Sequence, residues 1–281
     1  MKLNEFFTKA LSEGGSVPGV GAIHIDEIEP TLDYLEKLLH IDLKNNVLGS
    51  VGKKEFSGDM DVALNIPPEE IPAFIEKLNA MPEILELQKT SVIITKVKIA
   101  NYDQSIETSL SRTGYVQLDF MPGDPDWLKT YYHSPKEGDS KYKGVYRNIL
   151  LAEIAAHYER VESGGNLPDG RPIKLERFMW SPTQGLVRVV RVPAQNRNGD
   201  GYLKKSNTAT IDGPWKSPEE IVRVLNLGDI GSLDSFEKLL AAINNKYAPE
   251  LVEAILRKMA SSPNVKQMGI PDELEHFVTG E

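Results

Sequence analysis

The sequence contains no cysteine in its 281 residues. That absence excludes a disulfide framework, a zinc site built on thiolates and a thiol nucleophile. The chain also lacks any run of about 20 apolar residues, the length that a helix needs to cross a bilayer. Residues 1–5 do not begin a signal peptide. We therefore expect no association with a membrane and a location in the cytoplasm.

Motifs of several common enzyme classes are missing as well. The stretch Gly19-Val20-Gly21 lacks the third glycine and the lysine that dinucleotide sites and P-loops require. No serine lies in a G-x-S-x-G context, and the five histidines are scattered. Residues 196–201 imitate the opening of a calcium-binding loop, but the twelfth position of that loop is Asn207 rather than glutamate. We interpret the segment as a hairpin turn.

The sequence has fewer basic than acidic residues: 32 Lys and Arg against 41 Asp and Glu, which gives a net charge of −9. This balance weighs against an enzyme that grips long stretches of nucleic acid through its phosphates. Basic residues do recur locally, within residues 136–148 and then at Arg171, Lys174, Arg177, Arg188 and Arg191. A small acceptor or a short nucleic-acid end fits this distribution better than a long duplex.

The feature that stands out is a pair of aspartates, Asp59 and Asp61, at the start of an apolar strand over residues 60–66. Side chains alternate between the two faces of a strand, so both carboxylates point one way while Met60 and Val62 point into the core. Like charges held close together repel, and a divalent cation with oxygen ligands relieves that repulsion. The pair therefore predicts a magnesium site.

A third carboxylate extends this prediction. Residues 115–121 read as another strand, with Asp119 on the face that Gln117 shares and apolar residues on the opposite face. If this strand lies beside the first, Asp119 joins Asp59 and Asp61. Three carboxylates suit a pair of Mg²⁺ (or Mn²⁺) ions about 3.5–4 Å apart, an arrangement used for in-line phosphoryl transfer.

A turn at Gly49-Ser50 precedes the acidic strand and supplies backbone N–H groups and a hydroxyl, which are common ligands of phosphate. Lys53 and Lys54 follow within the spacer. Lys143 and Arg147 lie one turn apart at the start of a helix expected over residues 142–161, where they are candidates to clamp a triphosphate.

Together these residues resemble the DNA polymerase β-like nucleotidyltransferase superfamily. Its pattern of Gly-Ser, a short basic spacer, Asp-x-Asp and a later third Asp falls here on Gly49, Ser50, Asp59, Asp61 and Asp119. The resemblance covers about residues 20–160; the spacer is one residue shorter than in polymerase β, and no helix-hairpin-helix segment precedes it. The whole chain also resembles uncharacterised nucleotidyltransferase-like proteins of tailed phages. The implied roles are metal ligation and catalysis by the three aspartates and nucleotide binding, including ATP, by the Gly-Ser turn.

We expect an α+β fold: a polymerase β palm-like mixed sheet with flanking helices, followed by a small C-terminal sheet and a helical extension. The predicted domains are residues 1–163, the nucleotidyltransferase catalytic domain, and residues 164–281, a β-hairpin and helical domain. A short amphipathic helix is predicted over residues 1–16 and a helical bundle after residue 217. The sequence does not indicate an oligomeric state.

The predicted activity is metal-dependent transfer of a nucleoside monophosphate from an NTP or dNTP to an acceptor hydroxyl, with release of pyrophosphate. An RNA or DNA 3′ end is the favoured acceptor. Two alternatives stay open: nucleotidylation of a small molecule or a protein, which the acidic charge favours, and a palm-derived binding or assembly protein that has lost turnover.

Overall fold

A computed structural model describes residues 17–162, 165–195 and 202–279. The helix predicted over residues 1–16 and the turn predicted at residues 196–201 lie outside the described residues. The chain forms two compact units, residues 1–144 and residues 145–281. The sequence places the division after residue 163, whereas the structure groups helix α5 (Gly144–His157) with the second unit.

The first unit is built on a four-stranded mixed sheet in the order β3-β6-β5-β4. Its strands are β3 (Asp59–Leu64), β4 (Ile84–Lys89), β5 (Ile93–Lys98) and β6 (Tyr115–Pro122). β3 pairs parallel with β6, while β5 pairs antiparallel with both β6 and β4. Strands β1 (Ile23–His24) and β2 (Phe56–Ser57) form a separate two-stranded pair.

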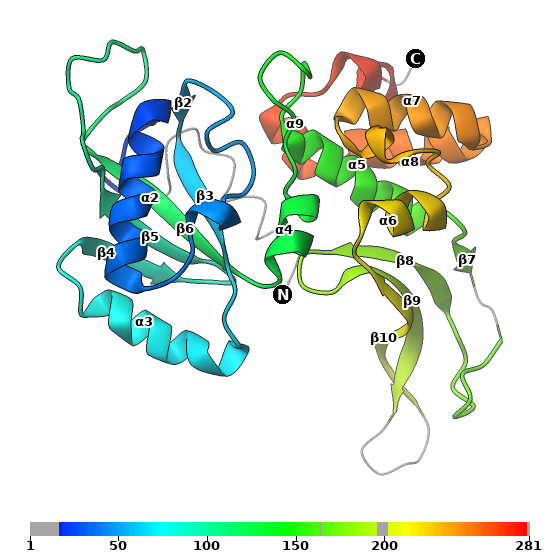
Figure 1. Cartoon of the computed structure of the whole chain (residues 1–281). Coiled ribbons are helices and arrows are strands. Elements are labelled where there is room, and N and C mark those ends of the chain that lie inside the picture. Colours follow the sequence, from blue (N-terminus) through cyan, green and yellow to red (C-terminus); the bar gives the residue numbers. More distant parts are fainter. Residues whose placement is uncertain (1–16, 163–164, 196–201, 280–281) are drawn as a thin grey trace. The chain divides into compact units, whose positions relative to one another are not determined.

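Two helices, α2 (Ile25–Leu39) and α3 (Ile71–Asn79), cover one face of this sheet (Figure 1). α2 begins at a capping box in which His24 and Glu27 each bond the backbone of the other, and its apolar residues recur every three or four positions. Those side chains pack with Met60 and Val62 of β3 and Leu118 of β6 in one buried core. The opposite face of the sheet carries the acidic residues.

Short elements complete the first unit: 3-10 turns η1 (Lys44–Asn46) and η2 (Pro68–Glu70), and helix α4 (Pro125–Tyr131). Asp124 caps α4, accepting from the N–H groups of Asp126 and Trp127. Leu128 of α4 packs with Leu48 and Ala63, so α4 lies against the face of β3 that α2 and α3 leave uncovered.

The second unit contains a four-stranded antiparallel sheet in the order β10-β9-β8-β7. Its strands are β7 (Val161–Glu162), β8 (Leu175–Ser181), β9 (Gly185–Gln195) and β10 (Tyr202–Trp215). The Nε1 of Trp180 on β8 donates to Asn148 of α5. The small sheet predicted for the C-terminal half is present.

The predicted bundle follows as α6 (Pro218–Val224), η3 (Ile230–Leu233), α7 (Phe236–Lys246), α8 (Pro249–Ala260), α9 (Pro263–Met268), η4 (Asp272–Leu274) and α10 (His276–Thr279). Ser217 and Glu220 form the capping box of α6, as the Ser-Pro-Glu-Glu sequence predicts. No helix among residues 17–162, 165–195 and 202–279 has the length and apolar character of a membrane span.

Candidate functional site

The register of β3 and β6 brings the three predicted acids together. Asp61 lies directly opposite Asp119, and Asp59 lies opposite Gln117. Since side chains alternate along each strand, all four residues share one face of the sheet. The next residues along the chain, Met60 and Leu118, are fully buried on the other face. The predicted pairing of the two strands is confirmed.

The charges of these carboxylates oppose one another. Burial, and then the charges of Asp59 and Asp119, raise the pKa of Asp61 well above its usual value. Burial and the charge of Asp59 raise the pKa of Asp119 to about 7. Burial also raises the pKa of Asp59, an effect that the nearby positive charge of Lys143 opposes. Without a counter-ion, the cluster resists carrying its full negative charge at neutral pH.

Gln117 fixes the orientation of Asp119, a role that the sequence does not reveal. Its side-chain Nε2 donates to Oδ1 of Asp119 at 2.9 Å and to Oδ2 at 3.1 Å. Gln117 is 4% exposed, so its rotamer is constrained by packing. The bond lowers the pKa of Asp119 and so opposes part of the effect of burial and of Asp59. Strand alternation places Gln117 on the acidic face, but only the pairing in space shows the contact.

The Gly-Ser turn lies directly beside this cluster. The N–H of Leu48 donates to the backbone carbonyl of Asp61 at 2.8 Å, which pins the start of the turn to β3. Gly49 has a φ of +65°, and a Cβ built on it would lie 3.4 Å from Oδ2 of Asp61. Glycine thus lets the backbone turn in the left-handed region next to a carboxylate. The following residue, Ser50, is exposed.

The predicted basic residues divide into two groups. Lys53 donates to the backbone carbonyl of Ser134, and Lys54 is exposed. Lys143 is exposed and close enough to Asp59 to affect its pKa. All three belong to the first unit, together with the aspartates.

Arg147 forms the other group, and its surroundings do not favour the predicted role of clamping a triphosphate. The side chain is 1% exposed and its Nε donates to the backbone carbonyl of Leu233 in the second unit. Burial lowers its pKa to about 10. Spacing alone puts Arg147 on the same helix face as Lys143, but the helix buries that position among its apolar residues.

Tyr132 is a second residue whose place at the site the sequence does not reveal. It follows α4 and packs against the cluster of Leu48, Ala63 and Leu128. Its pKa is raised by burial, then by Tyr131 and by the charge of Asp61, which places its ring near that carboxylate. Tyr132 therefore packs beside β3, the strand that carries Asp61.

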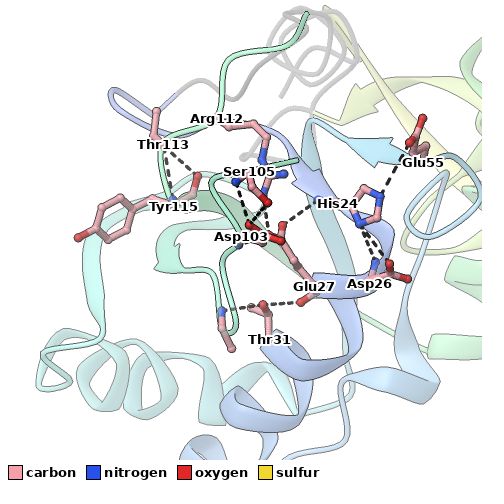
Figure 2. Close-up of polar contacts among 11 residues, drawn as sticks. His24, Asp26, Glu27, Thr31, Glu55, Asp103, Ser105, Arg112, Thr113 and Tyr115 are labelled. Carbon is pink, nitrogen blue, oxygen red and sulfur yellow. Dashed lines mark hydrogen bonds and ion pairs between the residues drawn. The ribbon is translucent and has the colours of Figure 1, made fainter. Parts of the chain in front are cut away.

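A separate polar network holds the loop between β5 and β6 (Figure 2). Oε1 of Glu27 accepts from Nη2 of Arg112 at 2.5 Å and from the N–H of Asp103 at 2.8 Å, while Oε2 accepts from the N–H of His24. The guanidinium of Arg112 also lies 4.8 Å from the ring centroid of Tyr102. The buried ion pair of Glu27 and Arg112 holds the loop against α2, and it is separate from the acidic face of the sheet.

Asp59, Asp61 and Asp119 do not by themselves surround a single metal ion. In the part of the chain that the structure describes, no three His, Asp or Glu side chains are arranged to enclose one metal ion by themselves. Magnesium does not require such a cage, because it is usually held by one or two carboxylates together with water and substrate phosphates. Two adjacent carboxylates with raised pKa values, Asp59 and Asp61, fit that mode of binding.

Comparisons with known proteins give similarities among solved structures only. No protein-family model and no curated protein match the sequence. Among solved structures, the fold is similar to polymerase β of Leishmania infantum in a ternary P/T complex, with 16% sequence identity and a TM-score of 0.34. The match covers 61% of this chain and 68% of that one. Function is therefore inferred from the side chains of the site.

Proposed function

We propose that this protein is a metal-dependent nucleotidyltransferase that moves a nucleoside monophosphate from an NTP or dNTP to an acceptor hydroxyl. The observation that supports this most directly is the convergence of Asp59, Asp61 and Asp119 on one face of two parallel strands, beside the Gly49 turn. Excess negative charge next to phosphate-binding backbone suits a site that binds a metal–triphosphate complex.

Asp59 and Asp61 would hold a Mg²⁺ (or Mn²⁺) ion together with the triphosphate, and Asp119 would complete a second position. When bound, the metal neutralises phosphate charge and increases the acidity of the attacking hydroxyl. The turn amides at Gly49 and Ser50 bind phosphate oxygens. Lys53, Lys54 and Lys143 supply further positive charge in the first unit.

In the proposed reaction, the acceptor hydroxyl oxygen attacks the α-phosphorus and a new P–O bond forms. The bond to the bridging oxygen of the β-phosphate breaks, and pyrophosphate leaves. Asp119 accepts the hydroxyl proton as a carboxylate on the same face as Asp61. Gln117 keeps that carboxylate in a fixed orientation.

A nucleic-acid 3′ end is the proposed acceptor. The second candidate, nucleotidylation of a small molecule or a protein, is favoured by the net charge of −9. The two are distinguished by labelled NTP incorporation into RNA or gapped DNA, and by mass spectrometry for a nucleotide adduct on other acceptors.

The test of the activity is release of pyrophosphate with each of the NTPs and dNTPs, in Mg²⁺ and in Mn²⁺. Asp61→Asn is expected to reduce turnover by at least about 10³-fold because a metal ligand is removed. Asp126→Asn, which removes an exposed carboxyl on α4, is the matched control and should retain turnover. Full activity of Asp61→Asn would refute the proposal. Failure of the wild type both to turn over and to bind NTP in calorimetry would support a catalytically silent protein instead.

A further inference from the structure

Three arginines meet on one face of the sheet in the second unit. β7 and β8 pair with Val161 opposite Glu176, so Arg160, the residue before β7, lies beside Arg177. β8 and β9 pair with Leu175 opposite Arg191, which makes Arg177 and Arg191 diagonal neighbours on that face. We call Arg160, Arg177 and Arg191 the arginine face.

Two other arginines of this unit lie outside the arginine face. Arg188 lies on the opposite face of the sheet, where it bonds Glu176 and approaches Glu159. Arg171 pairs with Asp169 in the loop before β8. These two arginines are thus matched by carboxylates in their own surroundings.

The arginine face is more crowded with positive charge. Burial, and then the charges of Arg160 and Arg191, lower the pKa of Arg177. Carboxylates also lie here: Glu162 pairs with Arg160 at the surface, and Glu153 lies near Arg177. Glu153 is also approached by His157 and Lys258, and burial raises its pKa. The surface pair of Arg160 and Glu162 contributes little to stability.

The face is also accessible. Arg160 and Arg191 are exposed and Arg177 is half-buried. On β10, Thr208 lies opposite Arg191 and Thr210 opposite Val189, and both threonines are exposed. Guanidinium groups and hydroxyls are both among the donors that proteins use for phosphate oxygens.

We propose that the arginine face binds the phosphate backbone of a single-stranded nucleic acid. The planar forks of guanidinium match phosphate bidentately, and three of them on or next to adjacent strands suit successive phosphates of one nucleic-acid strand better than an isolated anion. The assignment of the partner as a nucleic acid rests on the proposed function. Because the chain as a whole is acidic, binding has to depend on this local group of charges.

The test is fluorescence anisotropy with a labelled single-stranded RNA and DNA of about 12 nucleotides, using the full chain without nucleotide and a range of salt concentrations. The double variant Arg177→Gln/Arg191→Gln is expected to bind at least about 10-fold more weakly. The slope of log K against log salt should fall by roughly 0.7 for each phosphate that the variant no longer neutralises. Arg177→Lys/Arg191→Lys keeps the charge and should recover part of the affinity, provided that circular dichroism shows the same fold.

The control is Arg223→Gln/Arg257→Gln, which removes the same charge from exposed positions on α6 and α8. The proposal is overturned if the wild type does not bind at low salt, if this control weakens binding as much, or if a poly-glutamate peptide competes equally well. Asp61→Asn should bind nucleic acid normally. Arginine-dependent binding in a protein without nucleotidyl transfer would overturn the proposed function and leave the arginine face in place.

Discussion

Removing one carboxylate from the acidic cluster should stabilise the metal-free protein. The chosen substitution is Asp119→Asn, which keeps an oxygen that accepts from Gln117 and removes the charge. Asp119 has a pKa of about 7 in the folded protein, against an ordinary value of 3.8. A carboxyl whose pKa is raised on folding binds more protons in the folded state, so stability falls as pH rises between the two values.

The size of the effect follows from the pH range between the two pKa values of Asp119, 3.8 and about 7. Between pH 4 and pH 7 a single such group lowers the free energy of unfolding by about 1.4 kcal/mol for each pH unit, roughly 4 kcal/mol in all. The stability of Asp119→Asn relative to the wild type should therefore increase by about 2–3 kcal/mol from pH 5 to pH 7. Above pH 7 the difference should become constant. The comparison of two pH values cancels any fixed cost of the substitution itself.

The assay is urea unfolding in EDTA, followed by fluorescence of Trp127, which is buried in the first unit. Trp180 and Trp215 belong to the second unit and are replaced by phenylalanine in both proteins, so the signal reports the unit that carries the acids. Asp126→Asn serves as the control and should show no such pH dependence. A stability difference that does not change between pH 5 and pH 7 would contradict the reasoning. Added Mg²⁺ should stabilise the wild type more than Asp119→Asn.

Two further predictions concern the hydrogen bond from Gln117 to Asp119 and the ion pair between Glu27 and Arg112. Gln117→Leu removes the hydrogen bond that lowers the pKa of Asp119, so in urea unfolding with EDTA the loss of stability with rising pH should extend to higher pH than in the wild type; an unchanged pH dependence would show that the amide does not act on Asp119. Glu27→Gln leaves the buried guanidinium of Arg112 without its charged partner and should cost about 3–5 kcal/mol in urea unfolding. The double variant Glu27→Gln/Arg112→Met should recover much of that stability, and a cost below about 1 kcal/mol for the single variant would argue against the buried pair.

Strand alternation is the most reliable signal in the sequence. It correctly separates Asp59 and Asp61 from Met60 and Val62, because a period of two residues depends only on the local backbone. The pairing of β3 with β6 joins segments that are distant in the chain, and no local pattern fixes such a contact. The sequence shows only that a third aspartate lies on a second apolar strand, and that it would join the other two if the strands paired.

Burial is harder to predict than position. Helical spacing puts Lys143 and Arg147 on one face, yet the structure exposes the first and buries the second. An arginine within an apolar helix face can be exposed or buried. Burial is possible where a backbone carbonyl of another segment, here that of Leu233, accepts a hydrogen bond from the guanidinium. The contact of Gln117 with Asp119 escapes prediction for the same reason, since partners of buried polar groups are set by tertiary packing.

The choice of a neutral partner for Asp119 is consistent with a site built for a metal ion. A lysine or arginine at position 117 would neutralise the neighbouring carboxylate permanently and lower its pKa. The amide of Gln117 instead fixes the carboxylate while adding no positive charge. The cluster thus keeps its negative potential and its raised pKa values in the absence of metal, at a cost in stability. In the proposed function, a divalent cation that enters with the triphosphate would remove that cost, so the repulsion that weakens the metal-free protein would strengthen binding of the metal.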